Sequence, residues 1–320
     1  MRTYLFSILL FVNLLACREA TEEPRISAAA EDYLNEVLDI IEANSINRNT
    51  IDWSSFRSSV FAEVGAAQTL DETYEGVRQA LTLLADNHSF FLKPDGTGFS
   101  GEGTVRCDAE QVPDASVPQG VGYVRIGSFS GSSQEATAFA KAIQDRVRLA
   151  DDADLMGWIV DLRGNTGGNM WPMLVGVGPI LGEGVVGHFV DPDGSQFAWR
   201  YQNGASSGNG FVISEVAEPY SLIEANPKVA VLLDNNVASS GEAVAIAFIG
   251  RENTRSFGEA TCGLSTANAR FELSNQAELY LTVSYMADRN LNTYGGQLLP
   301  DVAVSNEEII DQAVSWISGS

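Results

Sequence analysis

The sequence is poor in histidine and cysteine, the residues that most often bind zinc. Among 320 residues it has only two histidines, His88 and His188, and three cysteines. Neither a Cys-x-x-Cys nor a His-Glu-x-x-His spacing occurs. Zinc sites are built from Cys and His ligands at such spacings, so the composition argues against a zinc enzyme. We therefore expect neither a metal ion nor a cofactor.

Basic residues are also scarce, with 19 Lys and Arg against 42 Asp and Glu and a net charge of −23. Nucleic acid and anionic lipid surfaces repel such a chain, and its charge mildly favours cationic partners. We expect no nucleic-acid partner. A solvated acidic surface explains the charge equally well, so the charge alone identifies no substrate.

The apolar run at the N-terminus is too short to cross a membrane. The stretch "MRTYLFSILLFVNLLAC" has one positive charge and then about a dozen mainly apolar residues, which is typical of an export signal. The small residue before Cys17 looks like the lipobox of a bacterial lipoprotein, in which the cysteine is lipidated. The alternative is an ordinary signal peptide with an incidental cysteine.

We expect residues 1–17 to be a lipoprotein signal peptide and residues 18–27 a polar tether. The protein would then contact the membrane only through the lipid anchor on Cys17. Arg18 is not an acidic retention signal, so a Gram-negative host would place the protein at the outer membrane, facing the periplasm. Any other host would place it on the cell surface.

Two cysteines remain after Cys17, namely Cys107 and Cys262. An even pair in an exported protein is compatible with a disulfide, but sequence cannot place the two residues within reach of each other. A bridge and two buried thiols therefore both stay open.

The chain changes character near residue 100. Apolar residues recur at helical spacing in 28–92, which predicts an N-terminal helical domain over residues 28–95. From residue 100 to 320, strand-like runs such as "LMGWIVDL" and "KVAVLLD" alternate with helical segments such as "SSQEATAFAKAIQDRVRLA". This alternation predicts an α/β core in which helices cover the faces of a sheet.

A glycine-rich turn, "DLRGNTGGNM" (161–170), follows the first of these buried strands. Its glycines allow backbone amides to face a ligand or an oxyanion. The spacing does not match a dinucleotide-binding fingerprint, and the lysine of a phosphate loop is missing. A plain strand-to-helix turn explains the glycines equally well.

The segment "DNNVASSGEAVAIAFIG" (234–250) follows the second buried strand. As a capping box, Ser239 would bond a first-turn amide and Glu242 would accept from the Ser239 amide. As a catalytic turn, the same serine would lie at the positive end of a helix, where a developing oxyanion is stabilised. The two interpretations are compatible.

A serine nucleophile needs a base, and only two histidines are available. His188 lies in "GVVGHFVDPDG", which predicts a strand with no other polar chemistry beside it. His88 lies in "LADNHSFF", where a helix breaks and where Asp86 could orient an imidazole. We therefore predict His88 as the base.

Five segments in this order resemble the serine peptidase family of carboxyl-terminal processing proteases, the tricorn core protease and the nisin resistance protein. They are "DNHSFF", "DLRGNTGGNMWPML", "VASSGEAVA", "GEATCGLS" (258–265) and "DRNLNTYGGQLLPDV" (288–302). The fourth looks like the family's conserved strand after the nucleophile helix. The resemblance implies a helical N-terminal part followed by a ClpP/crotonase-like α/β core.

The resemblance implies Ser239 as the nucleophile. The position of the lysine base of the processing proteases carries Leu264, so the chain is more similar to the branch with a Ser–His dyad, and His88 fits its histidine. Only about 25 residues separate the helical part from the core, too few for the PDZ domain of the Ser–Lys branch. Both features point to the nisin resistance protein as the closest pattern.

The resemblance also suggests supporting residues. The amide of Ser240, with that of Gly167 or Gly168, would form the oxyanion hole, and Asn169 and Met170 would line the peptide groove. Three residues are candidates for an orienting acid: Asp288, Glu242 and Asp86.

We therefore expect a serine endopeptidase that cleaves extended peptides or the C-terminal regions of proteins outside the cytoplasm. Its partner would be a peptide or an unstructured protein. Two alternatives stay open: a non-catalytic envelope protein that binds peptides or hydrophobic ligands on the same scaffold, and a serine esterase for small molecules.

Overall fold

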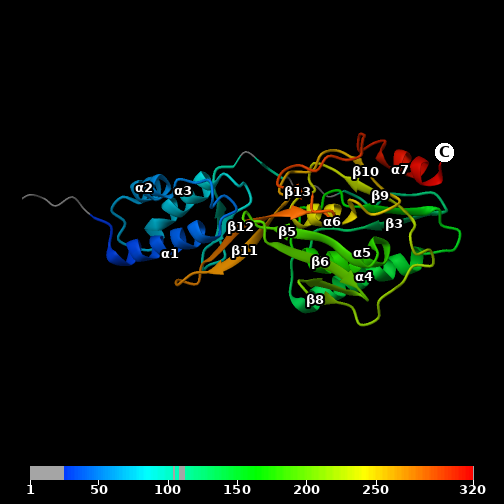
Figure 1. Ribbon diagram of the computed structural model, residues 1–320, viewed down its shortest axis with the longest axis horizontal. Coiled ribbons are helices and arrows are strands. Elements are labelled where there is room, and N and C mark those ends of the chain that lie inside the picture. Colours follow the sequence, from blue (N-terminus) through cyan, green and yellow to red (C-terminus); the bar gives the residue numbers. More distant parts are fainter. Residues whose placement is uncertain (1–24, 104, 108–111, 320) are drawn as a thin grey trace, which may run out of the picture.

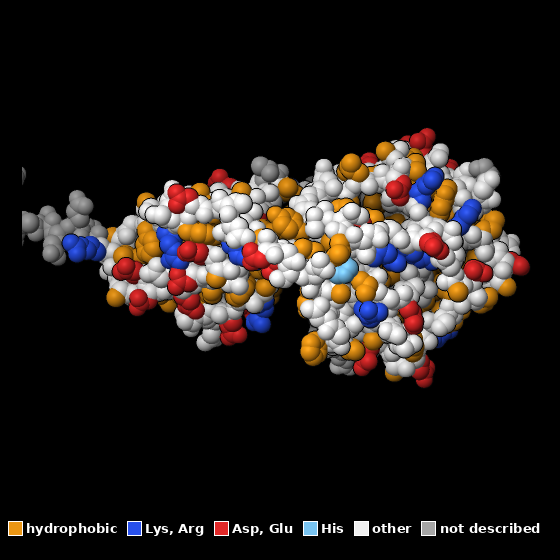
Figure 2. All heavy atoms as spheres, in the orientation of Figure 1, with side chains coloured by type: hydrophobic (Ala, Val, Ile, Leu, Met, Phe, Trp, Pro, Cys, Tyr) orange, Lys and Arg blue, Asp and Glu red, His pale blue; other side chains and the backbone are white. Residues whose placement is uncertain are grey.

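A computed structural model describes residues 25–103, 105–107 and 112–319 of the chain. Cys17 and the predicted signal peptide lie outside these residues. Figure 1 shows an elongated molecule with a helical unit at one end and a larger α/β core at the other. Figure 2 shows a narrow waist between the two parts, with acidic side chains scattered over both. No helix in the described ranges is long and apolar enough to cross a membrane.

The helical unit forms where the sequence predicts it. It contains α1 (Ala28–Asn44), α2 (Trp53–Val64), the short 3-10 helix η1 (Asp71–Thr73) and α3 (Tyr74–Leu84). Ser27 caps α1 by accepting from the Ala30 amide, and Asp52 caps α2. The apolar stripes predicted for α1 and α3 face each other in one hydrophobic core.

The α/β core contains a five-stranded parallel sheet in the order β14-β10-β9-β4-β3. Its strands are β3 (Val121–Arg125), β4 (Gly157–Asp161), β9 (Lys228–Leu233), β10 (Thr254–Gly258) and β14 (Val302–Ala303). The central strands β4 and β9 are buried almost throughout, as their continuous apolar runs predict.

Helices cover both faces of this sheet, which confirms the predicted α/β class. On one face lie α4 (Ser133–Ala150), α5 (Met170–Leu181) and α6 (Ser240–Phe248). On the other face lies α7 (Ile309–Ser318), which packs through Ile309, Ala313 and Ile317. The chain enters α5 after the carboxyl end of β4, and it enters α6 after the carboxyl end of β9.

A second, antiparallel sheet joins the core to the helical unit. Its main path is β2-β1-β12-β5-β6-β7-β8, and β11 and β13 also pair with β12. The strands are β1 (Phe90–Leu92), β2 (Gly98–Ser100), β5 (Gly184–Val190), β6 (Gln196–Gln202), β7 (Ala205–Gly208), β8 (Phe211–Glu215), β11 (Thr266–Glu272), β12 (Glu278–Ala287) and β13 (Thr293–Tyr294).

Strand β12 runs from one hydrophobic core to the other. Leu279 and Leu281 belong to the core of the helical unit, whereas Met286 belongs to the core beneath α4–α6. The helical unit therefore takes part of its interior from residues near the C-terminus. The domain limits 28–95 and 100–320 remain a prediction.

One expected strand does not form. Residues 259–265, most of the segment "GEATCGLS", make an irregular loop between β10 and β11, and only Gly258 belongs to a strand. The loop's amides are bound elsewhere: Thr261 donates to the Leu298 carbonyl and Cys262 to the Val237 carbonyl. These bonds replace the pairing that a strand would make.

Cys107 and Cys262 form a disulfide, with their Cα atoms 5.6 Å apart. Of the two possibilities left open by the sequence, the bridge is therefore the one found. It ties the connection that follows β2 to the loop 259–265, next to the carboxyl end of the parallel sheet.

Reducing this disulfide should destabilise the fold, because the bridge spans 155 positions and so restricts the unfolded chain strongly. We expect the free energy of unfolding to fall by about 2–5 kcal/mol. Guanidinium denaturation of the wild type and of Cys107→Ser, each with and without reductant, measures the effect. Reductant should shift only the wild type, and an unshifted wild type would contradict a stabilising role.

Candidate active site

Ser239 lies at the sharp turn between β9 and α6, in a backbone conformation that side chains rarely adopt. Its φ is 52° and its ψ is −118°. A non-glycine residue in such a region costs about 1–3 kcal/mol and is typical of functional turns. Its side chain makes no helix-capping hydrogen bond. The Glu242 half of the predicted capping box forms, because the Glu242 carboxylate accepts from the Ser239 amide. The Ser239 hydroxyl faces another partner.

That partner is His88, which lies in the connection between α3 and β1. The connection is held tightly: the Asp86 carboxylate accepts hydrogen bonds from the amides of His88 (3.0 Å) and Ser89 (2.8 Å). The Asn268 side chain on β11 donates to the His88 carbonyl (2.9 Å). Both sides of the histidine backbone are thus fixed, which limits the positions open to its ring.

The two predicted residues meet although 151 positions separate them. His88 Nε2 lies 3.0 Å from Ser239 Oγ, and His88 Nδ1 lies 2.8 Å from Thr266 Oγ1. With its proton on Nδ1, the imidazole donates to Thr266 and leaves Nε2 to accept from the serine hydroxyl. This is the arrangement of a nucleophile and its base.

The surroundings of His88 keep the imidazole neutral. Burial lowers the pKa of His88 to about 4, and the nearby charge of Asp86 opposes this shift only in part. At neutral pH the ring therefore carries no charge and can accept a proton. A base must be in this state before the reaction begins.

Thr266, which the sequence analysis missed, takes the place expected for an orienting acid. Asp288 accepts instead from the amides of Asn290 and Asn292 and from the Tyr294 hydroxyl, and so shapes its own loop. The Asp288 backbone carbonyl lies 3.2 Å from Nδ1 of His188, which is a residue of β5. The prediction of Asp288 as orienting acid is therefore wrong, and so is that of Asp86, which binds backbone amides.

The Glu242 carboxylate accepts four hydrogen bonds that hold the backbone in place, and it does not orient the imidazole. Its Oε2 accepts from the amides of Ser239 (2.9 Å) and Leu264 (2.8 Å). Its Oε1 accepts from the Thr261 hydroxyl (2.5 Å) and the Gly263 amide (3.1 Å). One carboxylate thus holds both the strained serine and the irregular loop that leads to β11.

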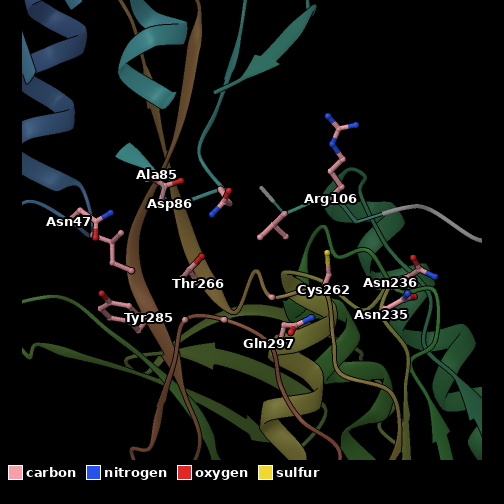
Figure 3. Close-up of a pocket in the computed structure, with 16 residues that line it drawn as sticks. Asn47, Ala85, Asp86, Arg106, Asn235, Asn236, Cys262, Thr266, Tyr285 and Gln297 are labelled. Atoms are coloured by element: carbon pink, nitrogen blue, oxygen red, sulfur yellow. The ribbon is translucent and has the colours of Figure 1, made fainter. Parts of the chain in front are cut away.

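A cavity of about 710 Å³ lies beside Thr266, which contacts His88, between the helical unit and the core. The helical unit contributes Asn47 and Asp86 to its lining, and the core contributes Asn236, Thr266 and Tyr285 (Figure 3). Cys262 also lies on its wall, so the disulfide borders the same space. The wall is mainly polar and bears few charges.

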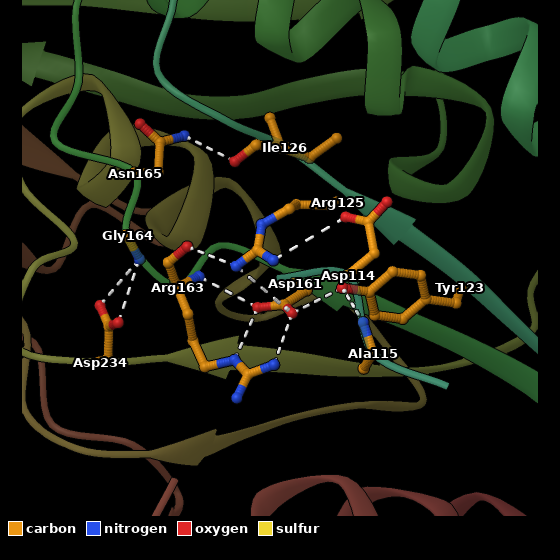
Figure 4. A network of polar contacts seen from close by, with 10 residues as sticks. All are labelled: Asp114, Ala115, Tyr123, Arg125, Ile126, Asp161, Arg163, Gly164, Asn165 and Asp234. Carbon is orange, nitrogen blue, oxygen red and sulfur yellow. Dashed lines mark hydrogen bonds and ion pairs between the residues drawn. The ribbon is translucent and has the colours of Figure 1, made fainter. Parts of the chain in front are cut away.

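A buried polar network fixes the glycine-rich turn on the other side of Ser239 (Figure 4). Asp161, fully buried at the end of β4, accepts from the amide and guanidinium of Arg163 and from the Tyr123 hydroxyl. The Asp234 carboxylate, at the end of β9, accepts from the Gly164 amide. The ends of neighbouring strands therefore define the path of the turn.

Within the turn 164–169, five of the six backbone amides donate to protein acceptors. These donors are Gly164 to Asp234, Asn165 to Leu162, Thr166 to Ser128, Gly167 to the Asn165 side chain and Asn169 to Phe129. The amide of Gly168 makes no hydrogen bond within the described part of the chain. Gly168 is also exposed, so its amide alone is free to bind a ligand.

At the start of α6, the backbone amides differ in the same way. The Ser239 amide donates to Glu242 and the Gly241 amide to the Ala238 carbonyl, whereas that of Ser240 has no acceptor among the described residues. A Cβ placed on Gly167 would lie 3.0 Å from Ser240 N, so turn and helix are in contact. Of the three predicted oxyanion donors, the amides of Gly168 and Ser240 remain candidates. The Gly167 amide is excluded because it donates to the Asn165 side chain.

Asn169 and Met170, which were predicted to line the peptide groove, have structural contacts in and around α5. Asn169 caps α5, its side chain accepting from the Trp171 amide at 3.0 Å. Met170 is only 5% exposed and packs in the core beneath the parallel sheet. The structure therefore gives Met170 a packing role rather than a place in a groove.

Glu242→Gln should reveal the cost of burying this carboxylate. Burial raises the pKa of Glu242 from 4.5 to about 7, although its four donors oppose the shift. Because the folded protein holds the proton of Glu242 more tightly than the unfolded chain does, the protonated carboxyl group contributes its full stability below pH 4.5. This contribution is lost as the pH rises through 7. The unfolding free energy of the wild type minus that of Glu242→Gln should thus fall by about 3 kcal/mol between about pH 4 and 8, at about 1.4 kcal/mol per pKa unit.

Urea denaturation of both proteins across this pH range measures the difference. A difference that instead grows with pH would show that the fold prefers the ionised carboxylate.

Comparison with known proteins places this geometry in a family. The nisin-resistance protein of Lactococcus lactis subsp. lactis is 26% identical over 296 residues, covering 91% of this chain and 88% of that protein. The carboxyl-terminal-processing protease of Synechocystis sp. is 26% identical over 197 residues, covering 61% of this chain and 40% of that protease.

Solved structures share the fold. A lipoprotein from Streptococcus agalactiae superimposes with a TM-score of 0.71 at 23% identity, covering 91% of this chain and 96% of that one. The photosystem II D1 C-terminal processing protease does so with a TM-score of 0.58 at 16% identity, covering 92% and 98%.

The model of Peptidase family S41 matches residues 120–304, which include β3, the glycine-rich turn, Ser239 and the whole of β12. This match spans more than half of the chain. The chain therefore belongs to peptidase family S41 and is a serine-type peptidase.

Proposed function

We propose that this protein is an endopeptidase with a Ser239–His88 dyad, acting outside the cytoplasm on extended peptides or on the C-terminal regions of proteins. The observation that carries the proposal is the 3.0 Å contact between His88 Nε2 and Ser239 Oγ, with His88 Nδ1 held by Thr266. A neutral imidazole, a strained serine and two free amides support the same reading.

In the proposed reaction, His88 Nε2 takes the proton of Ser239 as the serine oxygen attacks the peptide carbonyl carbon. The amides of Gly168 and Ser240 stabilise the negative charge that develops on the carbonyl oxygen. The C–N bond then breaks, and the imidazolium gives its proton to the leaving amine. A water molecule, deprotonated by His88, finally hydrolyses the acyl-enzyme and releases Ser239.

The cavity between the two parts supports an extended substrate. It borders Thr266, next to the dyad, and its amide-rich wall offers donors and acceptors to a peptide backbone. The relative from Synechocystis is named a carboxyl-terminal-processing protease, which supports cleavage near protein C-termini. An unstructured tail suits this space because it reaches the serine without unfolding a domain.

The export signal supports a site of action outside the cytoplasm. Cys17 is proposed as the lipidated residue, and the structurally similar protein from Streptococcus agalactiae is described as a lipoprotein. A disulfide between Cys107 and Cys262 is also typical of an oxidising compartment.

The two histidines provide a matched test of the proposed base. With an unstructured protein as substrate, Ser239→Ala and His88→Ala should each lower kcat/KM by roughly 10³-fold or more, because both act as one unit. His188→Ala should leave turnover within about twofold of wild type, since that ring, on β5, contacts the Asp288 carbonyl rather than Ser239. Equal loss in both histidine variants, or full activity in His88→Ala, would contradict the dyad.

A further inference from the structure

The side chain of Ser240 binds the glycine-rich turn instead of capping its own helix. Its hydroxyl donates to the Gly168 carbonyl at 2.6 Å, and the residue is only 7% exposed. This is a direct side-chain link between α6, which carries the proposed nucleophile, and the turn that carries the free Gly168 amide. It joins the two sides of the proposed oxyanion hole.

The turn is held on both sides of Gly168. On the preceding peptide, the Gly167 carbonyl accepts from the Phe129 amide at 3.2 Å, which orients the Gly168 N–H. On the following peptide, the Gly168 carbonyl accepts from Ser240. Gly168 has a φ of 111°, and a Cβ there would lie only 2.0 Å from the Phe129 carbonyl oxygen. The backbone conformation is therefore open to glycine alone.

Removing the Ser240 hydroxyl would leave the peptide after Gly168 with one of its two hydrogen bonds, that from the Asn169 amide to the Phe129 carbonyl (2.7 Å). The Gly168 carbonyl would then have no donor among the described residues, and the peptide after Gly168 could tilt about the remaining Asn169 hydrogen bond by a change in ψ. Glycine has no Cβ to resist that rotation. The Gly168 amide would lose its fixed distance to the Ser240 amide, and an oxyanion hole depends on that preorganisation.

We infer that the Ser240 side chain is a positioning residue that sets the geometry of the oxyanion hole through the Gly168 carbonyl. The inference rests on the proposed function, because it assigns no reaction of its own. The hydroxyl touches neither substrate nor nucleophile; its effect reaches the reaction only through the direction of the Gly168 amide.

The test compares Ser240→Ala and Ser240→Cys with the wild type. Cysteine keeps nearly the same volume but donates weakly, so it guards against a folding defect in the alanine variant. Ser206→Ala is the matched control, because the buried Ser206 hydroxyl on β7 donates to the Trp171 carbonyl (3.0 Å) away from the site. Measurements are kcat, KM and the inhibition constants of a peptide boronic acid and of a product peptide.

The boronic acid forms a tetrahedral adduct that fills the oxyanion hole, whereas the product peptide does not. Deleting an oxyanion donor costs about 10²–10³-fold in kcat, and displacing one should cost roughly tenfold or more. We expect Ser240→Ala to lower kcat by that factor with KM unchanged and to weaken the boronic acid equally. Product-peptide inhibition should be unchanged, Ser240→Cys should be intermediate, and Ser206→Ala should match the wild type.

Three results would overturn the inference. Wild-type kinetics in both Ser240 variants would show that the bond has no influence on the hole. Equal weakening of both inhibitors would show a general structural defect. A wild-type protein that neither cleaves peptides nor binds the boronic acid would overturn the proposed function first, and the inference with it.

Discussion

Strand β12 pairs with β1 through Phe90 and Tyr280 and with β5 through Ala287 and His188. The rings of Phe90 and Tyr280 stack with centroids 4.5 Å apart, which reinforces the first pairing. One ten-residue strand therefore fixes the helical unit against the α/β core. His88 lies two positions before the start of β1. Its position over Ser239 therefore depends on the register in which β1 pairs with β12. A shift of one residue would turn the alternating side chains to the opposite face.

The proposed catalytic geometry is stabilised by groups that do not themselves react. The conformation of Ser239 costs about 1–3 kcal/mol, and the Glu242 carboxylate offsets this by binding the Ser239 amide together with the loop 261–264. Thr266 directs the imidazole with a neutral hydroxyl, so the proposed imidazolium would have no carboxylate hydrogen-bonded to it. The disulfide holds the same loop from its other side. The site thus depends on a shared loop that has little regular structure of its own.

The sequence predicts much of this arrangement because some of its patterns are local. Buried strands, amphipathic helices and the serine at a strand-to-helix turn follow from apolar periodicity and from the residues that flank it. With only two histidines in the chain, the local polar context of His88 was enough to select it.

Other features depend on contacts between distant segments. Thr266 carries no local signal that separates it from other threonines, and it gains its role only when β11 folds beside the α3–β1 connection. Residues 259–265 resemble a strand by composition, but the carbonyls of Val237 and Leu298 and the Glu242 carboxylate bind their amides. Burial of Met170 likewise follows from helix packing, which a groove motif does not reveal.

Fluorophosphonate labelling of the fragment that begins after Cys17, with the adduct located by peptide mass spectrometry, tests the central claim most directly. We expect one adduct, on Ser239, which is lost in His88→Ala and kept in His188→Ala. Labelling should persist from neutral pH down to about pH 5, because the pKa of His88 lies at about 4. An adduct on Ser240, or labelling of Ser239 that does not require His88, would contradict the dyad.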